Sequence, residues 1–483
     1  MAFYKPLIIP FLQIPLELAL TEFFLTLKKH NMKRRLYILL LTTFISNCLL
    51  AQENQLIETI INDVSAERIE KDIRTLANFG TRNTFSDTIS NTRGIGAARR
   101  WIKSEFEQIA NKSEAKFDVF YQKDYVTTNA GERVPKDTWV VNVVAIQKSK
   151  KSSNSYVIMS GDIDSRNSDT MDFTGDAPGA NDNASGMAGV IEAARVLSKH
   201  NFEHNIIYLG LSGEEQGLFG GKGFAAFVKE KNWDMIGVLN NDMIGNIEGV
   251  DGVIDNRTFR IFSEPTNPTD SDYQKRLQRY YGGEVDGNSR QLARYIYTTT
   301  KKQMPEMKPM MIFRLDRFGR GGHHKPFSDL GFPAIRIMET HENYNRQHQN
   351  IRTENGIEYG DVINGVNFEF TKKLSTVNAI NIASLANAPL APSKVKIGGA
   401  VSANTTLEWQ KSDDPNILGY KIYWRETTSP TWDNSIFTTN TNSFTIKNLV
   451  IDNYYFGVAA VGKNGFESLV VFPEGIIKKA FTK

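Results

Sequence analysis

Cysteine is nearly absent from this chain, since Cys48 is the single one among 483 residues. No disulfide can therefore form within the chain, and its stability must come from packing. An excess of charge of one sign is also lacking, because the net charge is only +3 and no dense basic stripe occurs. Without a basic footprint, nucleic acid is not expected as a partner.

The most apolar stretch lies near the N-terminus. Basic residues precede an apolar run at 36–45, and a possible cleavage site ends at Ala51. This order is typical of a secretory signal peptide at 32–51, and the run is too short for a transmembrane helix. We interpret residues 1–31 as an over-extended start; the alternative is a two-part membrane-targeting segment. The sequence thus predicts a targeting region at 1–51 and a secreted or periplasmic mature protein without a stable membrane span.

The rest of the chain divides into two parts of different texture. A length of 483 residues predicts two or more domains, and 40% apolar with 23% charged residues is typical of globular proteins. A segment rich in alanine and proline at 388–393 reads as a linker. We therefore expect one domain at 52–387 and a second at 394–483.

Helical and strand-like patterns alternate in the first of these domains. Such alternation predicts an α/β fold with a mixed, largely parallel sheet flanked by helices. The helical patterns cover 57–78, 94–109 and 186–197, and the strand-like patterns cover 139–146, 156–159, 206–211 and 237–239.

The second domain reads as short strands separated by turns, at 406–409, 419–424, 443–446 and 454–461. This pattern predicts an all-β immunoglobulin-like sandwich. It resembles a fibronectin type III module, with Trp409 at the core tryptophan position and Tyr454, Phe456 and Val458 in a tyrosine-corner strand. The resemblance implies a module without chemistry of its own.

Acidic residues follow three predicted strands of the α/β domain and open one of its helices. Each group by itself has a plain structural explanation, such as a helix cap or a solvated surface pair. Parallel strands, however, bring their carboxyl ends to one edge, and buried carboxylates without counter-charges are very costly. Divalent metal ions would balance the charge. The residues are Asp162 and Asp164, the turn at 178–186 with Asp182, the pair Glu214 and Glu215, and Asp242.

In order and spacing these segments resemble a known family from about Thr81 to Asn378. The motifs are GDIDS (161–165), PGANDNASG (178–186), SGEEQG (212–217), NDM (241–243) and GGHHKPF (321–327). The chain is similar to the zinc aminopeptidases that include bacterial leucyl aminopeptidase, aminopeptidase Y, glutamate carboxypeptidase II and glutaminyl cyclase. The resemblance implies a metallopeptidase domain at 52–387 and a fold of the zinc-aminopeptidase type.

The same resemblance implies roles for individual residues. Asp182 is expected to bridge two divalent ions, with Asp162 and Asp242 completing one site and Glu215 and His324 completing the other. Glu214 is expected to act as the general base that takes a proton from the attacking water. His348 is expected to assist the tetrahedral intermediate. Zinc is the expected metal, with manganese or a single zinc ion as alternatives.

Two positions depart from the family pattern. Asp162 stands where relatives carry a histidine, and His323-His324 stands where they carry aspartate and histidine. The first change leaves Asp164 without the histidine that it orients in relatives. It also leaves open whether the Asp162 site holds an ion, and whether His323 replaces the lost imidazole.

The sequence predicts a secreted metal-dependent aminopeptidase that removes residues from free N-termini of peptides or proteins. A single-zinc glutaminyl cyclase, a carboxypeptidase of the same family and a catalytically inactive binding scaffold remain as alternatives. The intact Glu214 speaks against the scaffold, because a binding protein has no chemical need for the base.

Overall fold

The computed structural model describes residues 55–439 and 441–478. The predicted targeting region at 1–51 lies outside these residues. Within the part described, no helix has the length and apolarity needed to cross a membrane.

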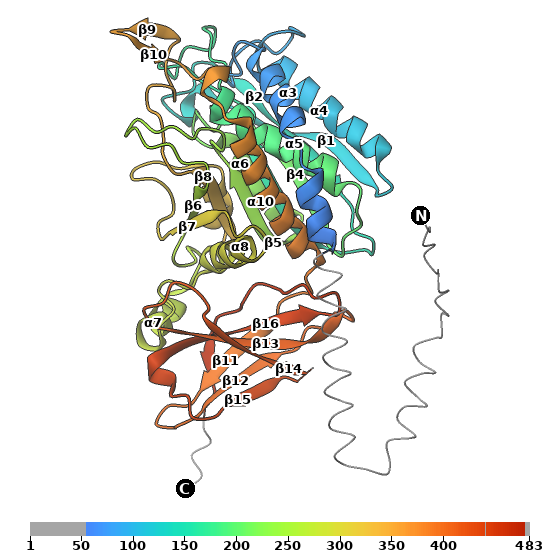
Figure 1. Cartoon of the computed structure of the whole chain (residues 1–483), viewed down its shortest axis with the longest axis vertical. Helices are drawn as coiled ribbons and strands as arrows, with labels where there is room; N and C mark the ends of the chain where they lie inside the picture. Colours follow the sequence, from blue (N-terminus) through green and yellow to red (C-terminus); the bar gives the residue numbers. More distant parts are fainter. Residues whose placement is uncertain (1–54, 440, 479–483) are drawn as a thin grey trace, which may run out of the picture. The chain divides into compact units, whose positions relative to one another are not determined.

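An eight-stranded sheet forms the centre of the α/β part, in the order β1-β2-β4-β3-β5-β8-β6-β7 (Figure 1). Strands β4, β3, β5 and β8 run parallel, whereas β1 and β2 are antiparallel at one edge and β6 is antiparallel to β8. The sheet is therefore mixed and largely parallel at its centre, as predicted. The strands are β1 (Phe117–Val126), β2 (Thr138–Gln147), β3 (Ser155–Asp162), β4 (Asn205–Leu211), β5 (Asp234–Asn241), β6 (Thr258–Ser263), β7 (Lys308–Ile312) and β8 (Ala334–Glu339).

Helices cover both faces of this sheet (Figure 1). Alternate residues of a strand point to opposite faces; accordingly Val157 and Met159 pack with α3, α4, α5, α8 and α10, whereas Ile158 packs with α6 and α9. The helices are α3 (Ala66–Ala77), α4 (Gly94–Lys112), α5 (Gly186–Leu197), α6 (Phe219–Glu230), α7 (Asp272–Tyr281), α8 (Asn288–Gln303), α9 (His324–Asp329) and α10 (Phe368–Asn387).

The predicted helices and strands of this part recur with small shifts of their ends, except for the helix expected at 57–78. Residues 55–63 are helical, and the chain then breaks before α3. Ser65 causes the restart, because its hydroxyl accepts a hydrogen bond from the backbone N–H of Arg68 at 3.3 Å and caps the new helix. Apolar residues keep their helical spacing across residues 64–65, so the sequence pattern does not reveal that the helix is interrupted there.

The C-terminal part is all-β, as predicted, with strand orders β15-β12-β11-β17 and β14-β13-β16. Trp409 and Tyr420 lie in its core, with ring centroids 5.2 Å apart. The strands are β11 (Ser393–Gly398), β12 (Thr405–Gln410), β13 (Ile417–Glu426), β14 (Asn434–Thr439), β15 (Ser443–Ile446), β16 (Tyr454–Gly462) and β17 (Gly475–Ile476); a small hairpin of β9 (Arg352–Glu354) and β10 (Ile357–Tyr359) precedes them.

A buried ion cluster joins this all-β part to the α/β part. Asp286 lies 2.7 Å from Arg294 of α8 and 2.8 Å from Arg425 of β13, and all three side chains are almost fully buried. Trp432 also donates a hydrogen bond to Gln291 of α8 at 3.0 Å. The C-terminal part is thus docked on the α/β part through a charged contact that water does not reach.

We expect Asp286→Asn to destabilise the protein by about 3–5 kcal/mol, because two buried guanidinium groups lose their counter-charge. Chemical denaturation followed by circular dichroism measures this change. Asp329→Asn is the matched control, since Asp329 pairs with Lys325 at the surface and such a pair contributes about 1 kcal/mol or less. Equal effects of the two substitutions would contradict the structural role of the cluster.

Candidate metal centre and active site

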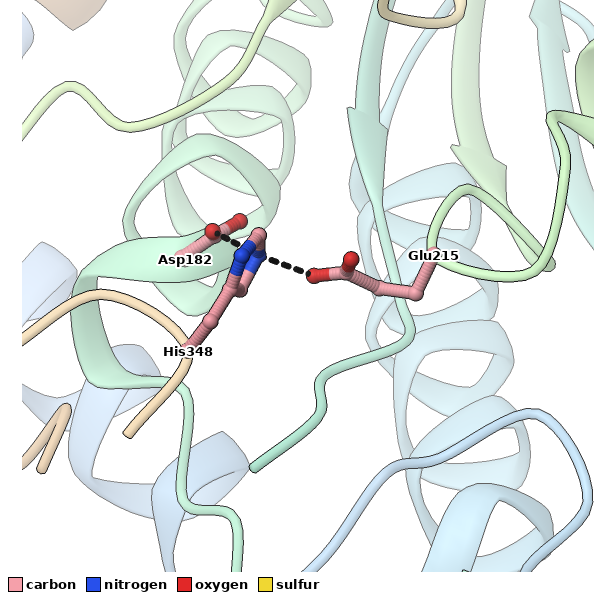
Figure 2. Close-up of side chains that lie close together, drawn as sticks. All are labelled: Asp182, Glu215 and His348. Atoms are coloured by element: carbon pink, nitrogen blue, oxygen red, sulfur yellow. Dashed lines mark hydrogen bonds and ion pairs between the residues drawn. The ribbon is translucent and has the colours of Figure 1, made fainter. Parts of the chain in front are cut away.

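Three side chains from distant parts of the sequence meet beyond the carboxyl ends of the central strands. His348 Nε2 lies 2.8 Å from Glu215 Oε1 and 2.9 Å from Asp182 Oδ2, so the imidazole sits between the two carboxylates (Figure 2). One ligand atom of each residue lies within 4.8 Å of those of the other two. Among the described residues, no other three histidine, cysteine or acidic side chains approach one another in this way.

Asp182 is held by the turn Ala180–Ser185, which leads into α5. Asp361 fixes this turn, because its two carboxylate oxygens accept hydrogen bonds from the backbone N–H groups of Asn181 at 2.8 Å and Asp182 at 2.6 Å. Gly179 has a φ of 52°, and a Cβ there would lie 2.4 Å from the carbonyl oxygen of Asp182. The turn therefore requires glycine at this position.

The pair Glu214 and Glu215 follows β4 in a turn that Asp164 secures. One oxygen of Asp164 accepts from the N–H of Glu214 at 3.2 Å, and the other accepts from the N–H of Glu215 at 3.1 Å. Asp164, left without a histidine to orient by the change at position 162, thus holds the backbone of the two glutamates.

Arg166 fixes two members of the cluster from outside and had no signal in the sequence. Its Nε donates to Glu215 Oε2 at 2.8 Å, and its Nη2 lies 2.6 Å from His348 Nδ1. Arg166 comes from the loop after β3, whereas His348 comes from the loop between β8 and β9. Because 182 residues separate them in the chain, only the fold reveals the contact.

The structure places His324 away from the group of three. This side chain is buried, but its Nε2 lies 2.8 Å from the carbonyl oxygen of Leu315 and 3.6 Å from Asp316 Oδ2, and it does not join Asp182 and Glu215. His323 and His324 are consecutive at the start of α9, so their side chains point about 100° apart around the helix axis. His323 faces the strand ends and His324 faces the loop. His348 lies where His324 was expected.

Asp162 and Asp242 have protein partners of their own. Asp162 contacts His323 Nδ1 at 2.5 Å through one oxygen and Asn183 Nδ2 at 2.7 Å through the other. Asp242 Oδ2 lies 2.7 Å from Nη2 of the buried Arg336, which belongs to the neighbouring strand β8. Neither Asp162 nor Asp242 joins the group formed by Asp182, Glu215 and His348.

The carboxyl groups of the site fall into two electrostatic classes. Burial alone would raise the pKa values of Asp182 and Glu215, but the charge of His348 lowers both below their ordinary values. Burial raises the pKa of Asp162 to about 8 and that of Asp242 to about 7. Burial and then the charge of Glu215 raise the pKa of the half-buried Glu214 well above its ordinary value. The carboxyl groups of Asp182 and Glu215 are therefore ionised, whereas that of Glu214 holds a proton more readily than an ordinary glutamate.

The chain is similar to known proteins over most of its length. The profile of peptidase family M28 matches residues 142–363, which contain all the residues named above for the site. A probable zinc metalloprotease of Pyrenophora tritici-repentis is 36% identical over 420 residues, covering 86% of this chain and 97% of its own. A probable zinc metalloprotease of Leptosphaeria maculans is 40% identical over 420 residues, covering 86% and 96%. The chain belongs to peptidase family M28.

Solved structures similar to this M28 protein include two enzyme classes. The LapA aminopeptidase of Legionella pneumophila is 19% identical with a TM-score of 0.49, covering 69% of this chain and 74% of its own. The glutaminyl cyclase of Porphyromonas gingivalis is 13% identical with a TM-score of 0.44, covering 66% and 98%.

The donor set of this M28 protein fits one divalent ion. Two carboxylates and one imidazole are three protein ligands of the kinds that zinc prefers, and three protein ligands leave a coordination position for water or substrate. His348 Nε2 already contacts both carboxylates, so one ion can replace these contacts without moving the backbone. The arrangement can therefore hold a metal ion with an open coordination position.

We expect the affinity for this ion to rise with pH. Burial lowers the pKa of His348, but Glu215 and Asp182 outweigh it and raise the pKa to about 9 from 6.5. In the metal-free protein the resulting stabilisation is complete below about pH 6.5 and is lost as the pH rises through about 9. A metal ion must displace this proton, so the apparent Kd should fall about tenfold per unit between pH 7 and 8.5. Calorimetric titrations at several pH values measure the slope; a flat profile would contradict the placement of His348.

Proposed function

We propose that this chain is a secreted metal-dependent aminopeptidase, with Asp182, Glu215 and His348 as the ligands of a zinc ion and Glu214 as the general base. The observation that carries the proposal is the meeting of these three ligands, one of which, Glu215, directly follows Glu214 in the chain. His348 thereby takes the ligand role expected of His324.

Zinc is supported by the donor set and by the relatives, which carry the name of probable zinc metalloproteases. When bound, the ion polarises the scissile carbonyl and lowers the pKa of water. Arg166 holds Glu215 in orientation, because its Nε donates to Glu215 Oε2 at 2.8 Å.

Glu214 moves the proton. Asp164 fixes its backbone, and burial with the charge of Glu215 gives its carboxyl group a raised pKa. A raised pKa makes the ionised carboxylate a stronger base toward the proton of water. We therefore propose that Glu214 takes the proton of the attacking water and delivers it to the leaving amine.

The motif resemblance to zinc aminopeptidases supports a substrate with a free N-terminus. Asp162 and Asp242 do not themselves select an ammonium group, because they already face His323, Asn183 and Arg336. We therefore propose removal of N-terminal residues over a carboxypeptidase-type activity on the ground of the resemblance.

The regions outside the catalytic part complete the proposal. We propose a signal peptide at 32–51 that directs the protein to the outside or to the periplasm. We also propose that the all-β part is a fibronectin type III-like module, which is supported by Trp409 in its core and by the split into two packed sheets.

The decisive experiment compares peptides with free and acetylated N-termini. We expect release of single residues from the free peptides only, loss of activity with a chelator, and recovery with zinc. Manganese is added back in parallel to identify the preferred ion. Cleavage of acetylated peptides, or none under any metal, would contradict the aminopeptidase assignment.

A glutaminyl cyclase is the second candidate, because a single group of three ligands suits chemistry with one ion. The two activities separate on one peptide with N-terminal glutamine. A cyclase releases ammonia and leaves the peptide 17 Da lighter, as follows from the mass of the expelled NH₃, whereas an aminopeptidase releases glutamine.

A further inference from the structure

Positive and hydrogen-bonding groups of the protein occupy the place where the sequence predicted a second metal site. That site was to be formed by Asp162, Asp182 and Asp242. In the structure only Asp182 takes part in a group of converging ligands, and the other two carboxylates face His323, Asn183 and Arg336.

Arg336 is the central feature of this place. It is fully buried in β8, beside β5, and its Nη2 lies 2.7 Å from Asp242 Oδ2. Its Nη1 lies 3.0 Å from Asp316 Oδ2 and 3.1 Å from the carbonyl oxygen of Gly321. Nη2 has no hydrogen-bond partner, so its contact with Asp242 Oδ2 is an ion pair without hydrogen-bond geometry. The other oxygen of Asp242, Oδ1, is buried and has no hydrogen-bond partner. The guanidinium is thus held by Asp316 on one side and balances Asp242 on the other.

Asp162 is likewise engaged on both oxygens, by His323 and Asn183. The His323 ring fits here because α6 approaches it at Gly221, where a Cβ would lie 2.6 Å from the ring. The imidazole of His323 is buried between α6 and the strand ends. Asp162 contacts its Nδ1 through one oxygen and accepts a hydrogen bond from Asn183, in the turn that carries Asp182, through the other.

We infer that the protein binds one divalent ion, at Asp182, Glu215 and His348, and that the guanidinium of Arg336 provides the positive charge that a second ion would bring. The inference rests on the proposed metal centre. Arginine keeps its charge at all relevant pH values, so this compensation is permanent. A second dication would have to enter beside a buried guanidinium, where like charges repel strongly and screening is weak.

A titration of the untagged, metal-free protein with Co²⁺ tests the inference without any substrate. The visible absorption of bound Co²⁺ should reach its end point at one equivalent, and mass spectrometry under native conditions should show one ion per chain. The variant His348→Gln should bind Co²⁺ far more weakly than the wild-type protein does. Asp242→Asn, the matched control at the other place, should still bind one equivalent, because Arg336 keeps Asp316.

Arg336→Met tests the guanidinium directly, and we expect the folded variant to bind a second equivalent near Asp242. A folded variant that stays at one equivalent would overturn the role of Arg336. If the variant does not fold, the wild type and Asp242→Asn still decide. Two equivalents in the wild type, one of them lost in Asp242→Asn, would overturn the inference but leave the proposed function intact. No bound ion in the wild type would overturn both.

Discussion

Glu214→Gln is expected to lower kcat by about 10²–10⁴-fold while the bound metal remains. The amide has nearly the shape of the carboxyl group, but it cannot accept a proton from water and return it to the leaving amine. Because Glu214 is not one of the three converging ligands, the metal content should stay that of the wild type. Steady-state hydrolysis of a free peptide, together with metal analysis of the same sample, measures both quantities.

Glu230→Gln is the matched control for this substitution. Glu230 is exposed at the end of α6, and the same chemical change there should leave kcat unaltered. Glu214→Gln that retained more than about a tenth of the activity would remove Glu214 from the role of general base. Loss of metal together with activity would instead make Glu214 a ligand.

His348→Gln is expected to weaken zinc binding by more than about 100-fold and to abolish hydrolysis at micromolar zinc. Loss of a partner that merely orients a ligand costs 10–100-fold in affinity, and loss of a ligand should cost more. Titration with a competing chelator measures the affinity. Activity should partly return at high zinc concentration, because Asp182 and Glu215 remain.

Two histidine controls separate this role from the one first expected. His341→Gln changes a histidine that pairs with Asp251 near the surface, and it should leave metal affinity and activity unchanged. His324→Gln should retain the metal, because its Nε2 contacts the 315–316 loop and not the cluster. If His324→Gln lost the ion and His348→Gln kept it, the ligand set would return to the one expected from the sequence.

Local patterns determined much of the fold. Continuous apolar runs marked β2 to β5, and a run of small and apolar residues marked α5 with the bounds that the structure has. Such patterns are visible because a strand or helix buries one or both faces over its whole length. The strand β1 went unrecognised, since it lies at the sheet edge and its side chains alternate little in burial.

The sequence by itself also determined that acidic residues gather at the carboxyl ends of β3, β4 and β5. Each follows its strand directly, and parallel neighbours align these ends. The motif resemblance then proposed Asp182 and Glu215 as ligands.

Only the tertiary structure decided which histidine completes the group. His323, His324 and His348 lie in segments whose course depends on packing, and the direction of each ring depends on its place in a turn or helix. The same holds for Arg166, Arg336 and Asp361, whose contacts cross long separations in the chain. The sequence records which groups are present, but the distance between two side chains far apart in the chain is set by how the sheet and loops fold together.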